Sequence, residues 1–521
     1  MYDYVVVGAG SAGCVMAGRL SEDPDARVCL IEAGSENSAD PTRIPSAAGV
    51  LQQSEYDWDY DTCEEPFCGG RRMYLPRGKI VGGTSVLNGM VYARGNPADY
   101  DGWRQPGWSY RDLLPYFKRA EDNERGESEH HGTGGPLAVS NGWYRSPAMT
   151  ALVEAAIEAG FPANPDISGP SQEGFGFYQI TGRAGERCSA ATAYLNPAIA
   201  RPNLTIESRM LVERVFFEGG RAAGVWARRN GERFQIRATR EVILAAGSYN
   251  SPQLLMLSGV GPADSLRTVG VPVVADLPMV GQNLQDHPQC WLVFTHSLPV
   301  SLSIAGEPQH IRQYELDRTG PVSSNGPEAG GFVRTGLDPE PDVQFHAFAG
   351  ALAENRLAIV GLHGFSMAPC LLTTRSRGSV SLIANDAGNK PLIRHNYYAD
   401  ATDLDAMVAA LRIGLEIARQ NPLKPFAETP YQVPASDSDA DLRAYARRHT
   451  QTCFHPAGTC AIGEVVDADL RVIGIDGLRV VDASVMPTLV RGNTNGPIIG
   501  IAERAADLIR GKAQTPVMAT A

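Results

Sequence analysis

The chain has 521 residues, of which 43% are hydrophobic and 20% are charged. These values are typical of a globular protein and exclude an intrinsically disordered one. Because a single hydrophobic core stops growing near about 250 to 300 residues, we expect two domains or more. The net charge of −12, without a cluster of basic residues, argues against nucleic acid as a partner.

Two further features predict where the protein works. No apolar run approaches the length of about 18 residues that a membrane-spanning helix needs, and the N-terminus does not resemble a signal peptide. The nine cysteines include no CxxC pair, which favours a reducing compartment over a disulfide framework. We expect a cytoplasmic protein without an integral membrane segment, peripheral to the inner membrane if it transfers electrons to a quinone.

Residues 4–34 predict a βαβ unit that binds a dinucleotide. A β-branched run leads into the sequence GAGSAG at residues 8–13, a helical stretch follows, and a second apolar run ends at Glu32. Gly8 permits the tight turn, Gly10 lets the backbone approach a pyrophosphate, and Gly13 lets the helix pack closely. A carboxylate at Glu32 would accept hydrogen bonds from a ribose diol, which indicates FAD or NAD rather than NADP.

The fold class that follows is α/β with mixed α+β character. We expect a Rossmann-like nucleotide domain that is interrupted by a substrate domain built on an antiparallel sheet, which forms one wall of a pocket. Helices are predicted at 146–161, 403–420 and 497–511, and strands with a hairpin turn are predicted within 202–247. The expected nucleotide domain comprises 1–155, 200–287 and 450–521, and the substrate domain comprises 156–199 and 288–449.

Three internal segments are rich in glycine and small polar residues. They are PRGKIVGGTSVLNG at 76–89, GSYNSPQLLMLSGVG at 247–261 and VGQNLQDH at 280–287. Backbone of this composition can approach a flat ring or a phosphate closely, and an asparagine such as Asn88 can both donate to and accept from a heteroaromatic edge. These segments therefore predict more of the cofactor site.

With the N-terminal motif and the stretch TCFHPAGTC at 452–460, these segments resemble the glucose-methanol-choline (GMC) oxidoreductase family over residues 3–511. Within that family the chain looks most similar to bacterial acceptor-linked alcohol and L-sorbose dehydrogenases. The resemblance implies FAD, and Leu87 stands where covalently flavinylated relatives have histidine, so noncovalent FAD is implied. The implied cofactor contacts are Gly8, Gly10, Ser11, Ala12, Gly13, Glu32, Ala33, Arg77, Gly82, Gly83, Thr84, Ser85, Asn88, Gly89, Met90, Val91, Val212, Ala246, Gly247, Asp482, Ala483, Asn493, Thr494 and Asn495.

The resemblance also assigns the catalytic pair. His455 matches the histidine that acts as the base beside flavin N5, and Asn493 matches its partner position. Oxidising an alcohol requires a group that accepts the hydroxyl proton near neutral pH, which suits histidine, while the amide of Asn493 would hold the alkoxide oxygen. A metal site of Cys453, His455 and Cys460 is not expected, because no fourth ligand follows at suitable spacing. A structural histidine remains the alternative.

The positive N-terminal end of the helix that begins near Pro497 would face the flavin and stabilise negative charge on its reduced form. The chain departs from the family at Phe454, where relatives often have tyrosine, and at Ala461, where many have arginine. Candidates for the substrate pocket are Gly326, Glu328, Phe345, His346 and Phe454.

The predicted function is FAD-dependent oxidation of a primary alcohol, with sugars and aromatic alcohols as options, to the aldehyde or ketone. Oxygen, a quinone or another carrier would reoxidise the flavin. An FAD-containing carbon-carbon lyase of the hydroxynitrile type is the alternative, and a noncatalytic flavin-binding protein is a third reading.

Overall fold

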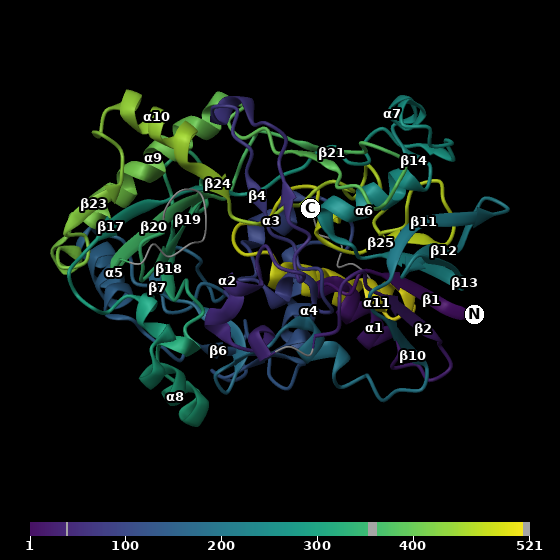
Figure 1. Ribbon diagram of the computed structural model, residues 1–521, viewed down its shortest axis with the longest axis horizontal. Helices are drawn as coiled ribbons and strands as arrows, with labels where there is room; N and C mark the ends of the chain where they lie inside the picture. Colours follow the sequence, from purple (N-terminus) through teal and green to yellow (C-terminus); the bar gives the residue numbers. More distant parts are fainter. Residues whose placement is uncertain (38–39, 353–361, 514–521) are drawn as a thin grey trace.

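The computed structural model describes residues 1–37, 40–352 and 362–513 (Figure 1). The first sheet is mostly parallel and combines strands from residues 2–31, 204–244 and 478–480, in the order β10-β2-β1-β13-β12-β11, with β25 paired to β13. Its strands are β1 (Tyr2–Val7), β2 (Val28–Ile31), β10 (Leu204–Glu207), β11 (Leu211–Glu218), β12 (Arg221–Arg229), β13 (Glu232–Leu244) and β25 (Leu478–Val480).

The βαβ unit at the centre of this first sheet forms as the sequence predicts. β1 and β2 pair in parallel, with Val6 opposite Leu30, and α1 (Ser11–Leu20) connects them. The four residues of β2 and the last four of β1 are buried, as expected for a strand covered on both faces. The hairpin between β11 and β12 turns at Gly219 and Gly220, which both have positive φ.

A second, antiparallel sheet lies at the other end of the molecule, in the order β23-β17-β20-β19-β18-β7, with β16 paired to both β20 and β24 (Figure 1). This arrangement confirms the predicted fold class. Its strands are β7 (Gly174–Phe177), β16 (Pro288–Cys290), β17 (Leu292–Thr295), β18 (Ala329–Val333), β19 (Val343–Phe348), β20 (Gly364–Leu371), β23 (Thr429–Gln432) and β24 (Thr450–Thr452).

Helices cover one face of this second sheet. α9 (Ala401–Ala418) packs on β20, and α5 (Pro147–Glu158) packs on β18 and β7. Their apolar side chains join those of the sheet in one buried cluster, separate from the cluster around the first sheet. The remaining helices include α3 (Pro97–Gly102), α4 (Tyr110–Ala120), α6 (Gly247–Leu257), α8 (Pro308–Asp317), α10 (Asp439–His449) and α11 (Asn495–Ile509).

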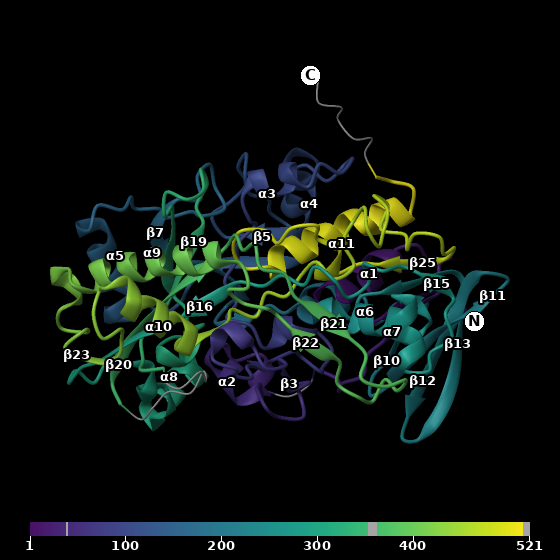
Figure 2. The same ribbon diagram turned by 90° about the horizontal axis from the view of Figure 1, so that it is seen from above.

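The last helix, α11, lies between the two sheets and packs on α1 and α4 (Figure 2). The carboxylate of Glu503, which is fully buried, accepts from Arg19, Arg119 and Tyr194 at 2.6–2.8 Å. Because a buried carboxylate with several charged donors is costly to displace, these contacts fix the position of the helix. Its N-terminus is thereby held beside the glycine motif, where Ser11 donates to Asn495 at 2.7 Å.

The predicted domain boundary at residue 155 falls inside α5. All of the buried side chains on this helix that contact hydrophobic neighbours belong to the cluster of the antiparallel sheet. We therefore propose that α5 goes with the substrate domain, and we keep the other proposed boundaries. In the part of the chain that the structure describes, no helix combines the length and apolarity needed to cross a membrane.

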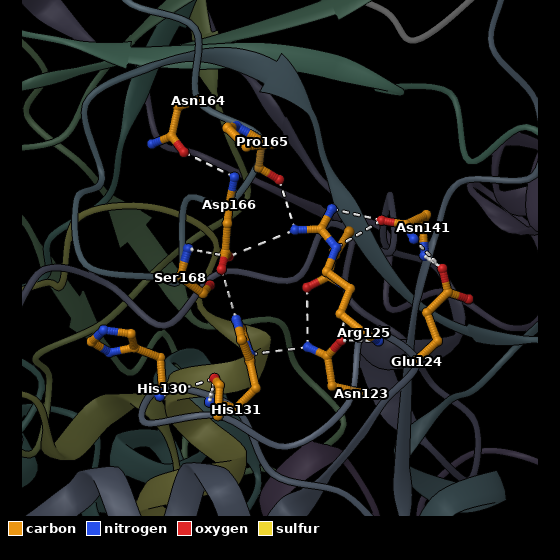
Figure 3. A network of polar contacts seen from close by, with 12 residues as sticks. Asn123, Glu124, Arg125, His130, His131, Asn141, Asn164, Pro165, Asp166 and Ser168 are labelled. Carbon is orange, nitrogen blue, oxygen red and sulfur yellow. Dashed lines mark hydrogen bonds and ion pairs between the residues drawn. The ribbon is translucent and has the colours of Figure 1, made fainter.

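A buried polar network ties a third, smaller sheet to the loop at 164–168 (Figure 3). This sheet consists of β5 (Glu121–Asn123), β6 (Leu137–Asn141), β8 (Gln179–Arg183) and β9 (Glu186–Arg187). His131 contacts the carboxylate of Glu121 at 3.1 Å and that of Asp166 at 2.9 Å. Burial alone would lower the pKa of His131, but the hydrogen bonds to Asp166 and Glu121 outweigh it and raise the pKa.

A prediction follows from the direction of this shift. A histidine with a raised pKa stabilises the fold fully below its unfolded value of about 6.5, and the contribution is lost as the pH rises through the folded pKa. We expect His131→Asn to lower the unfolding free energy by about 1–3 kcal/mol at pH 6 and by less at pH 8.5. Urea unfolding at both values tests this, with His130→Asn as control. A pH-independent difference would contradict it.

Candidate active site

A narrow cleft opens above the carboxyl ends of β1, β2 and β13. It is lined by the glycine motif, by Glu32 and Ala33 after β2, and by Ala246 and Gly247 after β13. Glu32 is 6% exposed, and its two oxygens accept from the backbone N–H of Ala9 at 2.9 Å and of Gly34 at 2.8 Å. Burial raises the pKa of Glu32 to about 7. A diol placed at this carboxylate would supply the hydroxyl donors that ribose recognition uses.

The glycines of the motif do different work. A Cβ on Gly13 would lie 1.8 Å from the carbonyl oxygen of Gly8, so Gly13 is required for packing α1 on β1. Gly10 has an ordinary φ of −75°, and its nearest contact for a Cβ is 4.0 Å away. Glycine is therefore needed at position 10 neither for the backbone conformation nor for packing against other protein atoms. The cradle that a side chain there would fill fits a pyrophosphate at the N-terminus of α1.

The second glycine-rich segment packs directly on this motif. Gly82 donates its N–H to the carbonyl of Ala9 at 2.7 Å, and a Cβ on Gly83 would lie 2.6 Å from the Cα of Gly10. This contact places Thr84 and the residues after it along the edge of the cleft. The cleft thereby continues into a second cavity of about 1050 Å³, with a shared lining of Ser11, Arg77, Thr84, Thr494 and Ile498.

His455 and Asn493 are in contact with each other and both line this large cavity. The amide nitrogen of Asn493 lies 3.3 Å from Nε2 of His455 and 3.3 Å from Nε2 of His346. The amide oxygen of Asn493 accepts from Gln344 at 3.0 Å, which fixes the orientation of the amide. The two hydrogens of the amide therefore point at the two imidazoles, and both Nε2 atoms act as acceptors.

A second buried histidine completes the assignment. Nδ1 of His455 lies 3.0 Å from Nδ1 of His287, and the two rings are perpendicular. Burial lowers the pKa of His287 to about 3, so this imidazole is neutral. Since Nε2 of His455 is an acceptor, its proton sits on Nδ1 and is donated to His287. Nε2 of His455, a residue that lines the cavity, thus carries no proton and accepts from the amide of Asn493.

The segment that carries His455 is held in a strained conformation. Phe454 has a φ of +68°, an uncommon value for a residue with a Cβ. Asp286, which is 3% exposed, accepts from the backbone N–H of His455 at 2.8 Å and from the hydroxyls of Thr452 and Tyr397. Asp286 thereby fixes the turn that directs the imidazole into the cavity.

Most residues expected around the cofactor line one of the two cavities. Gly13 and Gly82 do not, because both serve the packing described above. The lining of the narrow cleft includes Gly8, Gly10, Ser11, Ala12, Glu32, Ala33, Arg77, Gly83, Thr84, Val212, Ala246, Gly247, Asp482, Ala483 and Thr494. The lining of the large cavity includes Ser85, Asn88, Gly89, Met90, Val91, Asn493 and Asn495, together with Ser11, Arg77, Thr84 and Thr494 again.

The expectations for the substrate pocket need correction at two residues. Gly326, His346 and Phe454 line the large cavity, whereas Phe345 and Glu328 do not. Phe345 is fully buried on the helix-covered face of the second sheet, because neighbouring residues of a strand point to opposite faces. Glu328 accepts from the backbone N–H of Ser146 and the hydroxyl of Ser324, both at 2.7 Å, and burial raises its pKa to about 7.

Sequence reasoning missed several functional residues. His287 lies in the segment VGQNLQDH, which was noted only for its glycine and polar content, and Gln344 carries no motif of its own. Trp291 and Phe348 contribute aromatic rings to the cavity wall. The alternation of β19 could have indicated that Gln344 shares a face with His346, but no local signal places either beside Asn493.

Comparisons with known proteins agree with this geometry. The sequence profile of GMC oxidoreductases matches residues 2–289 and 374–502. An oxygen-dependent choline dehydrogenase of Burkholderia cenocepacia is 43% identical over 98% of this chain and 94% of its own length. The mitochondrial choline dehydrogenase of Homo sapiens is 41% identical, over 98% and 90%. The crystal structure of pyridoxine 4-oxidase from Mesorbium loti superimposes with a TM-score of 0.89 at 32% identity, over 97% and 98%.

Fold and site therefore define a flavin-dependent oxidoreductase. The chain belongs to the GMC oxidoreductase family, which confirms the resemblance seen in the sequence. It is an FAD-dependent enzyme that acts on alcohols.

Gly10 offers a direct test of where the cofactor lies. We expect Gly10→Val to fold but to bind FAD about tenfold or more weakly, because its methyl groups would occupy the cradle and overpacking costs about 1–3 kcal/mol. The measurement is flavin absorbance per protein after loading and desalting, with circular dichroism as the check on folding. Gly102→Val, at another glycine with open space around it, is the matched control. Equal FAD content in both variants would contradict the assignment.

Proposed function

We propose that this enzyme oxidises a primary alcohol to the aldehyde, with His455 as the base and Asn493 as the group that positions the substrate oxygen. The observation that carries the proposal is the pair of polar groups at the end of the large cavity. One is Nε2 of His455, and the other is the amide of Asn493, which donates to that nitrogen at 3.3 Å; a substrate hydroxyl would enter between them, give its proton to Nε2 and accept from the amide. An alcohol hydroxyl needs both an acceptor for its proton and a donor for its oxygen.

Bound FAD would supply a hydride acceptor at its N5 atom. Nε2 of His455 takes the hydroxyl proton, and the charge that arises on the imidazole is shared with His287 through the Nδ1 contact of 3.0 Å. The amide of Asn493 donates to the alkoxide oxygen and holds it in place. The first turn of α11, which begins at Asn495, presents N–H groups without partners inside the helix, and they favour negative charge at this end of the cavity.

We propose that FAD is held noncovalently. Arg77, Thr84 and Thr494 would hold the centre of the cofactor where cleft and cavity join, and Asn88 and Met90 would contact the ring. The side chain in the position where covalently flavinylated relatives carry histidine is Leu87, which offers no nucleophile and lines the cavity. Denaturation should therefore release all of the flavin from the protein.

The walls of the cavity bear on the substrate class. Trp291, Phe348 and Phe454 line the cavity, and Leu302 and Leu352 add aliphatic surface. These side chains offer no partners to the hydroxyls of a sugar, although Gln289, Ser324 and Asn325 also line the cavity. Such a wall suits an alcohol with an apolar, aromatic or quaternary ammonium body, because aromatic faces attract cations. The names of relatives, choline dehydrogenase and pyridoxine 4-oxidase, fall within that range.

The finer likeness to acceptor-linked alcohol and L-sorbose dehydrogenases stays a prediction. Oxygen and a quinone or other carrier remain the candidate acceptors, and a screen of alcohols with oxygen or an artificial dye distinguishes them.

We also propose that the protein acts in the cytoplasm. In support, all nine cysteines lie in the described part of the chain and none of them is paired there.

The proposed role of His455 predicts a large loss of activity. We expect His455→Ala to slow anaerobic flavin reduction by about 10² to 10⁴, because that is the usual contribution of a general base. Stopped-flow absorbance with choline, pyridoxine and benzyl alcohol measures the rate. A wild-type rate in the variant would overturn the mechanism. Product formation by the wild type while its flavin stays oxidised would instead support the alternative of a lyase.

His287 is expected to act as a positioning residue. His287→Ala removes the acceptor that keeps the proton of His455 on Nδ1, and placing a catalytic histidine in the wrong tautomer is costly. We expect flavin reduction to slow by about tenfold or more in His287→Ala. His287→Asn should recover part of the rate, since an amide oxygen can accept the same bond. If both variants lose activity equally while FAD content is unchanged, the tautomer argument fails.

A further inference from the structure

Three side chains that commonly bind metals gather on the cavity face of the second sheet. They are His346 on β19, Cys370 on β20 and Cys453 just after β24, and all three are buried. One ligand atom from each lies within 4.8 Å of the others, and Nδ1 of His346 is 3.8 Å from Sγ of Cys453. From the spacing of Cys453, His455 and Cys460, the sequence predicted that those three residues form no metal site. The cluster of His346, Cys370 and Cys453 is a different set, and only Cys453 belongs to both.

Backbone pairing brings these residues together. Cys370 lies opposite Gln344 in the antiparallel pair of β19 and β20, and His346 lies two residues further along β19. Because side chains alternate between the faces of a strand, His346 and Cys370 point to the same face. Cys453 is fixed beside them by its N–H, which donates to the carbonyl of His287 at 2.8 Å. The cluster is therefore a property of the sheet.

The spacing and the chemistry suit a thiophilic cation. Zinc bonds of about 2.3 Å to sulfur and 2.0 Å to nitrogen place tetrahedral ligands roughly 3.6 Å apart, close to the observed 3.8 Å. Two thiolates would neutralise a divalent ion, so burying the ion leaves no net charge. His346 and Cys453 line the large cavity, which leaves a fourth position open to water.

We propose that His346, Cys370 and Cys453 bind one thiophilic divalent cation and that its binding inhibits alcohol oxidation. The inhibition, unlike the binding, rests on the proposed roles of His455 and Asn493.

The inhibition follows from the tautomer of His346. In the metal-free protein Nε2 of His346 accepts from Asn493, so its proton lies on Nδ1 and points at Cys453. A metal on Nδ1 moves that proton to Nε2, which then faces the amide hydrogens of Asn493, donor against donor. The amide must rotate, and its oxygen leaves the hydrogen bond from Gln344. The donor that positions the substrate oxygen beside His455 is lost.

Zn²⁺ is the probe. The sample is FAD-loaded enzyme in a phosphine reductant, which keeps both thiols reduced. We expect one zinc per chain after gel filtration, activity lowered at least about tenfold, and full recovery with a chelator; Co²⁺ should give a thiolate-to-metal charge-transfer band. Cys370→Ala, which does not line the cavity, should keep its basal activity and weaken zinc binding and inhibition at least about tenfold. Cys460→Ala, which also removes a buried thiol, is the matched control.

The outcomes separate the two claims. Zinc bound with equal affinity by wild type and Cys370→Ala, or no zinc retained by wild type, overturns the site. Zinc bound as expected but without loss of activity overturns the inhibition. Because stoichiometry is measured apart from turnover, failure of the proposed alcohol oxidation would leave the binding result intact, whereas a failed binding result would leave the function untouched.

Discussion

The site depends on one buried carboxylate, that of Asp286. It accepts from the backbone of His455 and from the hydroxyls of Thr452 and Tyr397, which come from two parts of the chain. A buried charge without these donors would cost several kcal/mol, so carboxylate and donors are mutually dependent. The left-handed turn at Phe454, unfavourable in isolation, is stabilised by the same contacts. The direction in which His455 points follows from this arrangement.

A series of hydrogen bonds connects the side chains beside this turn, and its donors and acceptors follow one another in one direction. His287 accepts from His455, the amide of Asn493 donates to His455 and to His346, and Gln344 donates to Asn493. With the amide of Asn493 oriented by Gln344, each of these hydrogen bonds has a donor facing an acceptor, whereas Nε2 of His287 has no partner among the described residues. A change at one end, such as a cation on His346, is therefore transmitted to the base through hydrogen bonds rather than through backbone movement. Function and proposed inhibition use the same network.

The two sheets supply residues for different parts of the site, one for each cavity. The first sheet contributes glycine backbone and one carboxylate, which recognise a nucleotide through close approach and hydrogen bonds. The second sheet and the segments beside it contribute histidines, the amide of Gln344 and aromatic rings, which surround the proposed substrate position. The helix α11 lies where the two halves meet, and the burial of Glu503 against Arg19 and Arg119 keeps its N-terminus at that junction.

Local patterns explain what could be predicted. The dinucleotide motif, the β-branched strands around it and the three glycine-rich segments are contiguous in sequence, and each meets its physical requirement within a few residues. The family resemblance added the pair of His455 and Asn493. The pattern placed His346 in the pocket but could not exclude Phe345 from it, because both faces of β19 are buried and its alternation does not say which face meets the cavity.

The amino-acid sequence by itself determined the nucleotide-binding unit, the fold class, the family and the type of reaction. These depend on residue types and on their spacing within short stretches of the chain. Tertiary structure alone decided which partner each ring nitrogen of His455 has, that His287 and Gln344 contact the catalytic pair, and that Cys370 joins His346 and Cys453. Those facts depend on the register of β19 with β20 and of β16 with β24, and on where the segment of Asn493 meets the sheet, none of which is set by local sequence.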